Sequence, residues 1–283
     1  MHIVSFKYKD TTGLGALLGD EVVNLTAMGL PTTLDQLLRL GDNWFEAAKK
    51  ACKQASNRIP VAEIQWLPPI AYPSKAIAVG LNYVDHATES NFEAPDYPVL
   101  FQRYPSSWVA HQEALVRPSV STQFDYEGEL VVVIGKAGHR ISKSDALSYV
   151  AGYSLFNDGS IRDYQLKSQQ WMMGKNFDCS GAFGPTFVTA DELPAGAKDL
   201  ILTTRLNGTV MQQASTNDMI FDIATLVSVC SEAFTLQPGD IIISGTPSGV
   251  GMARDPQVFM KAGDTCEIEI EGIGVLQNPV VDE

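Results

Sequence analysis

The chain has 283 residues, of which 45% are hydrophobic and 19% charged, a composition typical of a folded protein and not of a disordered one. At about 100–200 residues per domain, this length fits one large domain or a small domain followed by a larger one. The sequence holds 20 Lys and Arg against 33 Asp and Glu, a formal net charge of −13. Such an acidic surface repels nucleic-acid phosphates, and no apolar run approaches the roughly 18 residues of a membrane span. We therefore expect neither nucleic acid nor a membrane as a partner.

Two sequence features bear on the location of the protein. The N-terminal residues contain no basic stretch followed by an apolar run, so we expect no secretory leader. The four cysteines lie far apart and none forms a C-x-x-C pair, which disfavours a disulfide framework or a zinc ribbon. We therefore predict a cytoplasmic protein.

The N-terminal part of the chain predicts a small α/β unit. Short apolar runs separated by glycines over residues 1–25 are typical of two or three small strands. Leucines with helical spacing predict a helix over 34–38, and a second helix is expected over about 43–55. Three prolines within residues 67–73 form a stiff, non-helical connector. We place a boundary there, between a small N-terminal domain over 1–67 and a main domain over 68–283.

The main domain is rich in strand patterns. The β-branched run Leu130–Ile134 predicts a strand buried on both faces. Asn207-Gly208 between apolar runs predicts a hairpin with a type I′ turn. Many strands with few helices favour a sheet-rich barrel, roll or sandwich. Further expected elements are strands over 76–79, 152–157 and 241–244, a hairpin over 265–276, a helix over 145–150 capped by Ser144, and a helix over 222–233.

An acidic cluster lies at the start of the buried strand. In an extended strand, side chains at i and i+2 share a face, so Glu127 and Glu129 project together with Gly128 opposite. Asp158, at the end of the next predicted strand, offers a third carboxylate. Three carboxylates with no nearby histidine or thiolate suit Mg²⁺ or Mn²⁺. The alternative is a solvated strand face, which explains most E-x-E pairs; the buried strand that follows argues against it, and the local spacing leaves both interpretations open.

A histidine and a glutamate precede this cluster. If the segment after residue 80 is helical, His86 and Glu89 lie at i and i+3 and their side chains meet. A carboxylate beside an imidazole raises its basicity, which suits a general base that activates water. A surface histidine with an incidental neighbour is the alternative, because H-x-x-E alone is a weak signal.

Polar residues surround the third carboxylate. A strand end turning into a helix would place Asp158, Arg162 and Gln165 on one helical face, where Arg162 could hold a substrate carboxylate. Lys175 follows in an apolar setting and could stabilise a developing enolate. The glycine-rich loop at 244–251 lacks the ending of a phosphate loop, and we expect it to bring backbone N–H groups and the Thr246 hydroxyl close to a ligand. Each feature has a simpler alternative: Arg162 could pair with an aspartate on a helix surface, Lys175 could be a surface lysine, and the glycine-rich loop could be an inert turn.

In this order along the chain, the motifs resemble the fumarylacetoacetate hydrolase family. The resemblance covers about residues 68–280, and the first 67 residues look like the smaller, more variable domain of longer members. The motifs that carry it are Val79-Gly80-Leu81-Asn82-Tyr83-x-x-His86-x-x-Glu89, Asp125-Tyr126-Glu127-Gly128-Glu129-Leu130, Asn157-Asp158-x-Ser160-x-Arg162-Asp163-x-Gln165, Gly174-Lys175, Pro238-Gly239-Asp240 and Gly245-Thr246-Pro247-x-Gly249-Val250-Gly251.

The resemblance implies a sheet-rich α+β fold, a mixed β-sandwich roll with a small N-terminal α/β domain. It further implies a homodimer with one Mg²⁺ or Mn²⁺ per subunit and a small 2-oxo or dioxo acid as substrate. By motif position, Glu127, Glu129 and Asp158 would be the metal ligands, His86, Glu89 and Lys175 the catalytic residues, and Arg162, Gln165, Thr246, Tyr83 and Arg103 the substrate contacts.

Members of this family are hydrolases, decarboxylases and isomerases, so the resemblance leaves the reaction open. The leading expectation is hydrolysis of a C–C bond in an acylpyruvate or other 2,4-dioxo acid through a metal-bound enolate, with the His–Glu dyad activating water. The alternatives are oxaloacetate decarboxylation, or isomerisation or hydration of a 2-hydroxymuconate-type dioate, on the same site. A non-catalytic metal-binding module ranks below these, because both His86 and Lys175 are present.

One motif departs from the family pattern. Many relatives carry F-x-K-P-x-S where this chain reads Phe101-Gln102-Arg103-Tyr104-Pro105-Ser106-Ser107. We expect Arg103 and Tyr104 to alter the distal part of the substrate pocket and therefore the specificity.

Overall fold

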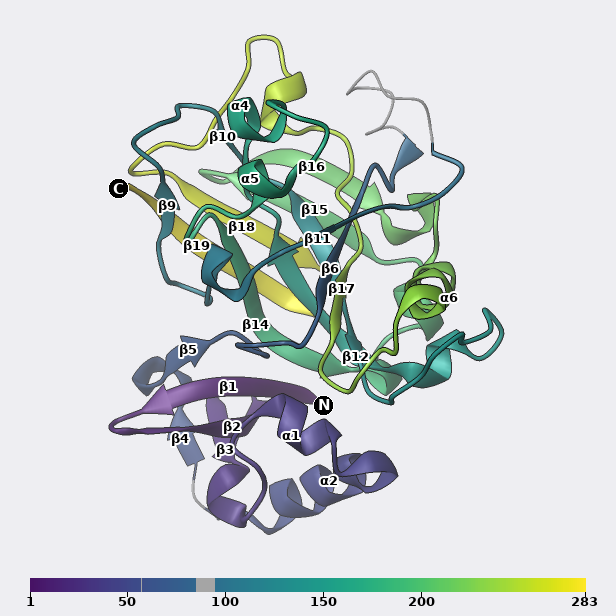
Figure 1. The fold of residues 1–283 in the computed structure, drawn as a ribbon. Coiled ribbons are helices and arrows are strands. Elements are labelled where there is room, and N and C mark those ends of the chain that lie inside the picture. Colours follow the sequence, from purple (N-terminus) through teal and green to yellow (C-terminus); the bar gives the residue numbers. More distant parts are fainter. Residues whose placement is uncertain (57, 85–94) are drawn as a thin grey trace.

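A computed structural model describes residues 1–56, 58–84 and 95–283. Within these residues, most of the strands form two sheets that pack against each other, and the two N-terminal α-helices pack on the outer face of the larger one (Figure 1). This arrangement is the predicted sheet-rich α+β fold. None of the helices described is long and apolar enough to cross a membrane.

The large sheet has 12 strands within the described residues. Its path runs through β4 (Arg58–Pro60), β3 (Glu21–Asn24), β2 (Thr11–Leu18), β1 (His2–Tyr8), β14 (Gly181–Thr189), β12 (Val150–Asn157), β11 (Gly128–Ile134), β17 (Ile241–Ile243), β6 (Ala76–Gly80) and β7 (Val99–Gln102), with β5 (Gln65–Leu67) on β1 and β8 (Trp108–Val109) on β14. The second sheet runs β16 (Thr209–Ser215), β15 (Ile201–Leu206), β18 (Thr265–Ile270), β19 (Gly274–Asp282) and β9 (Leu115–Arg117). A short pair joins β10 (Phe124–Asp125) to β13 (Ser160–Ile161).

The central strand β11 is buried on both faces, as its β-branched run predicts. Leu130, Val132 and Ile134 face a core shared with the second sheet and with α6 (Ile223–Ala233). Val131 and Val133 face the opposite core, which is closed by α1 (Leu34–Leu38) and α2 (Trp44–Gln54). This alternation follows from the two-residue period of a strand. It also decides which of the two cores each side chain near the start of β11 faces.

The N-terminal part extends the main sheet. Strand β1 pairs antiparallel with β14, with His2 opposite Val188, so β1 to β5 continue the sheet of the main part instead of forming a sheet of their own. The predicted N-terminal strands and both helices are present (Figure 1). The boundary between residues 67 and 68 stays a prediction.

One predicted element differs from the structure. The expected helix over 145–150 is a single 3₁₀ turn, Ala146–Tyr149, and Val150 already belongs to β12. Ser144 does not cap it; the hydroxyl of Ser142 instead accepts the N–H of Asp145 at 3.3 Å. Val150, the last residue of the expected helix, is instead paired with Ile134 of β11, and this tertiary pairing overrides the local helix propensity there.

Candidate metal and active site

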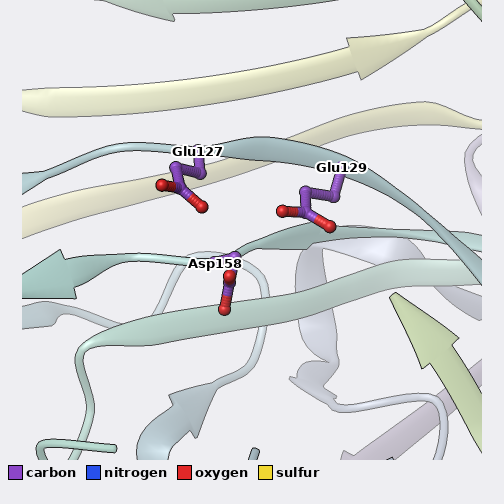
Figure 2. Close-up of side chains that lie close together, drawn as sticks. All are labelled: Glu127, Glu129 and Asp158. Carbon is purple, nitrogen blue, oxygen red and sulfur yellow. The ribbon is translucent and has the colours of Figure 1, made fainter. Parts of the chain in front are cut away.

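Three buried carboxylates converge at one end of β11 and β12. Glu127 lies just before β11, Glu129 is the second residue of β11, and Asp158 follows β12 directly. The antiparallel pairing sets Gly128 opposite Asn157, and the N–H of Asp158 donates to the carbonyl of Glu127 at 2.8 Å. One oxygen from each carboxylate lies within 4.8 Å of the other two, and Figure 2 shows the three side chains close together, with Asp158 beside the pair of glutamates. The structure therefore brings together the three residues that the sequence analysis grouped.

The alternation of β11 explains why both glutamates face the site. Gly128 faces the second sheet, where a Cβ would lie 2.2 Å from the Thr204 Oγ1. Glu127 and Glu129, one residue to either side, face away from that sheet and are 4% and 1% exposed. This burial contradicts the interpretation of a solvated strand face.

Lys175 lies among the carboxylates. It ends the short helix α5 (Met172–Lys175) and is 2% exposed. Its Nζ lies 2.6 Å from Glu127 Oε2 and 2.6 Å from Asp158 Oδ2, and 5.2 Å from the ring centre of Phe101. Lys175 is therefore a charged partner of two of the three carboxylates, not a surface lysine.

Arg162 begins the helix α4 (Arg162–Gln165) and is also buried. Its Nε donates to Asp125 Oδ2 at 2.8 Å, and its Nη1 lies 2.7 Å from Glu127 Oε1 and 2.8 Å from Gln165 Oε1. Its Nη2 has no hydrogen-bond partner among the described residues. Asp158 lies outside this helix, contrary to the expected shared helical face, because the chain first forms β13.

Asp125 is a residue of the site that the sequence analysis did not assign. It is fully buried, its Oδ1 accepts the N–H of Gly251 at 2.7 Å, and its Oδ2 accepts the N–H of Met252 at 3.0 Å besides Arg162. Asp125 thus fixes Arg162 and the loop that follows residue 249. The signal for it was available, because Asp125 precedes Glu127 and Glu129 with the same two-residue spacing.

The glycine-rich loop closes the side of the site next to Glu129. The N–H of Gly245 donates to Glu129 Oε2 at 2.5 Å, and Gly245 has a positive φ of 100°, which glycine adopts readily. The Thr246 hydroxyl donates to the Gly128 carbonyl at 2.9 Å and accepts from Gln212. The loop's Gly245 N–H and Thr246 hydroxyl therefore both bind the strand that carries the glutamates, and their expected contact with a ligand stays a prediction.

The remaining predicted residues lie in different places. Arg103 is buried behind Asp158, with its Nη1 2.9 Å from Asp158 Oδ1. Tyr83 is buried, and its hydroxyl has no hydrogen-bond partner among the described residues. Burial, and then the charge of Glu129, raises the pKa of Tyr83. His86 and Glu89 lie outside the described residues, so the proposed dyad stays a prediction.

A cavity opens at the cluster. Its polar wall includes the three carboxylates, Arg162, Gln165, Lys175 and Thr246, and its apolar wall includes Val79, Leu81, Phe101, Leu166, Trp171 and Met252. Among the residues predicted for the site, Arg103 and Tyr83 do not line this cavity. A pocket with one polar wall and one apolar wall is typical of a binding site for a small organic acid.

The charge of the cluster fits a divalent cation. Burial, followed by repulsion from Asp158 and Glu127, raises the pKa of Glu129 well above its ordinary value. The donors are carboxylate oxygens, the ligands that Mg²⁺ and Mn²⁺ prefer. A cation held by Glu127, Glu129 and Asp158 would neutralise this repulsion, so the residues fit such an ion.

Comparisons with known proteins agree with this geometry. The C-terminal domain of fumarylacetoacetate (FAA) hydrolases matches residues 75–281. The mitochondrial oxaloacetate tautomerase Fahd2a of Rattus norvegicus is 40% identical over 272 residues, 95% of this chain and 87% of that protein.

Two solved structures share the fold over the whole chain. A fumarylacetoacetate hydrolase from Exiguobacterium antarcticum has 33% identity and a TM-score of 0.87, with 100% of both chains covered. The maleylpyruvate hydrolase from Sphingobium sp. SYK-6, in complex with manganese(II) and pyruvate, has 29% identity and a TM-score of 0.82, covering 100% of this chain and 99% of that one. The sequence match, the fold and the motifs all agree, and the chain belongs to the fumarylacetoacetate hydrolase family.

Proposed function

We propose that this protein is a divalent-metal-dependent enzyme that tautomerises a small 2-oxo dicarboxylic acid such as oxaloacetate. The observation that carries the proposal is the convergence of three buried carboxylates beside Lys175 and Arg162. The 40% identity to an oxaloacetate tautomerase over 95% of the chain favours tautomerisation among the reactions of this family.

Glu127, Glu129 and Asp158 would hold the cation, which supplies a Lewis acid that polarises the 2-oxo group. The other residues act on the substrate itself. Going from the enol to the keto form, the proton on the C2 oxygen leaves and a proton is added at C3, with negative charge on the oxygen in between. The Lys175 ammonium is the nearest buried positive charge to two of the ligands, and it would stabilise that charge.

Arg162 would orient the substrate through a carboxylate. Two of its three nitrogens are held by Asp125, Glu127 and Gln165, whereas Nη2 has no partner among the described residues and the side chain lines the cavity. A buried donor left unsatisfied costs about 1–3 kcal/mol, which a substrate oxygen would recover. One nitrogen suits one oxygen of the substrate carboxylate that Arg162 was expected to hold.

The experiment measures the decay of enol-oxaloacetate by its ultraviolet absorbance, with the uncatalysed rate subtracted. We expect a chelator to abolish the enzymatic rate and added Mg²⁺ or Mn²⁺ to restore it. Glu129→Gln should lose the metal-dependent rate, and Glu271→Gln, an exposed glutamate, is the matched control. A rate that survives both the chelator and Glu129→Gln rejects the proposal.

Hydrolysis of an acylpyruvate is the second candidate, supported by the structural match to a maleylpyruvate hydrolase. Hydrolysis differs in needing a base that activates water, the role proposed for His86 and Glu89. An assay for pyruvate released from a panel of acylpyruvates distinguishes the two reactions. If hydrolysis is the native activity, His86→Ala should remove it; if the variant hydrolyses at the parent rate, the dyad assignment is wrong.

Decarboxylation, the isomerase alternative, the homodimer and the cytoplasmic location stay predictions.

A further inference from the structure

Each of the three carboxylates has one oxygen held by a protein donor from outside the cluster. Arg162 Nη1 lies 2.7 Å from Glu127 Oε1, the N–H of Gly245 lies 2.5 Å from Glu129 Oε2, and Arg103 Nη1 lies 2.9 Å from Asp158 Oδ1. The other oxygens of Glu127 and Asp158 lie 2.6 Å from Lys175 Nζ, and one oxygen of each of the three carboxylates lies within 4.8 Å of the other two, close enough for a shared ion. The motifs assign both arginines to substrate contacts, but Arg103, unlike Arg162, does not line the cavity.

The surroundings of Arg103 show a site built for its guanidinium. The side chain is wholly buried, and its Nη1 also donates to the Gly159 carbonyl at 3.0 Å. Its Nε donates to Ser107 Oγ at 3.1 Å and its Nη2 to the Ser107 carbonyl at 3.2 Å. The glycine at 181 leaves room for it, because a Cβ there would lie 2.4 Å from Nη2.

The guanidinium of Arg103 binds protein acceptors and lies outside the cavity. Every nitrogen of Arg103 has a protein acceptor, and Arg103 does not line the cavity next to the carboxylates. The planar fork of arginine can hold Asp158, Gly159 and Ser107 at fixed angles, whereas a lysine ammonium is a single point of charge.

We infer that Arg103 is a positioning residue for the metal ligand Asp158, not a substrate contact. The inference rests on the proposed function, because it assumes that the three carboxylates hold a cation. By holding Oδ1, Arg103 restricts Asp158 to one coordinating oxygen. Three single oxygens leave open positions on a six-coordinate Mg²⁺ or Mn²⁺, and they disfavour Ca²⁺, which takes six to eight oxygens and accepts both oxygens of a carboxylate.

The test is Arg103→Lys in the full-length protein, which keeps the charge and removes the fork. The Mn²⁺ dissociation constant is measured by electron paramagnetic resonance, with Ca²⁺ as competitor, and KM and kcat for enol-oxaloacetate are measured at saturating Mn²⁺. We expect Mn²⁺ affinity to fall about 10–100-fold, as for other residues that orient metal ligands. The preference for Mn²⁺ over Ca²⁺ should fall as well, and KM should change less than about twofold. Arg205→Lys, at a partly exposed arginine paired with Glu269, should change neither value.

A second variant keeps the test decisive if Arg103→Lys does not fold. Ser107→Ala removes the hydroxyl that accepts from Arg103 Nε and donates to the Tyr104 carbonyl, and it should weaken Mn²⁺ binding in the same direction by a smaller factor. Unchanged Mn²⁺ affinity with a raised KM would overturn the inference and make Arg103 a substrate contact. If the parent protein binds no Mn²⁺, the proposed function itself is refuted. If the parent binds Mn²⁺ and the variants bind it equally well, only the inference about Arg103 is refuted.

Discussion

The close packing of Gly128 against the second sheet makes a quantitative prediction about the strand that carries both glutamates. A Cβ at this position would lie 2.2 Å from Thr204 Oγ1, 3.2 Å from Leu202 Cδ2 and 3.3 Å from Ile268 Cγ2. The first distance is too short for any contact, so Gly128→Ala must push β11 away from β15 or rotate Thr204. Overpacking of this kind destabilises a core by about 1–3 kcal/mol, and we expect that loss in the free energy of unfolding measured with urea.

The same displacement should reach the proposed metal site, because Glu127 and Glu129 flank Gly128. We expect Gly128→Ala to weaken Mn²⁺ binding as well as stability. Removing the clash should reverse both effects. The hydroxyl of Thr204 has no hydrogen-bond partner among the described residues, so Thr204→Ala breaks no bond there and costs about 1 kcal/mol for the lost buried methyl group.

A double-mutant cycle tests this reasoning. In the Thr204→Ala background, Gly128→Ala should cost almost nothing or stabilise slightly, because alanine restricts the unfolded chain by about 0.4–1 kcal/mol relative to glycine. The two changes should therefore couple by about 1–3 kcal/mol. If Gly128→Ala costs the same in both backgrounds, the strand is not held by this contact and the reasoning is refuted.

Two further predictions concern buried charges. Lys175→Met removes the ammonium that lies 2.6 Å from Glu127 and Asp158; we expect turnover to fall about 100-fold or more, whereas calorimetry should still detect metal binding because the three carboxylates remain. Burial lowers the pKa of His111 to about 4, and its Nδ1 accepts the N–H of Gln277 at 3.1 Å. As the pH drops from about 6.5 to 4, the imidazole of His111 is protonated in the unfolded chain but still neutral in the folded protein. The free energy of unfolding should therefore fall over this pH range. The shift alone corresponds to at most about 3 kcal/mol, which we reduce to about 1–2 kcal/mol because the imidazole is partly exposed. His111→Gln should remove this part of the pH dependence, and an unchanged slope in urea titrations would contradict the assignment.

The sequence by itself determined the features that depend on local periodicity. The two-residue period placed Glu127 and Glu129 on one face of β11, with Gly128 opposite, and the β-branched run after them predicted burial on both faces. The Asn207-Gly208 turn joins two strands as expected. Such patterns can be recognised because neighbouring residues in a strand or helix have fixed relative directions.

The tertiary structure alone decided which donor holds which carboxylate oxygen. Arg103 meets Asp158 across 55 residues, Arg162 meets Asp125 across 37, and the Gly245 N–H meets Glu129 across 116. No local spacing encodes these contacts, because they depend on how β7, β11, β12 and the glycine-rich loop pack together. The sequence could therefore group the three carboxylates proposed as metal ligands, but it could not separate the arginine that lines the cavity from the arginine that lies behind it.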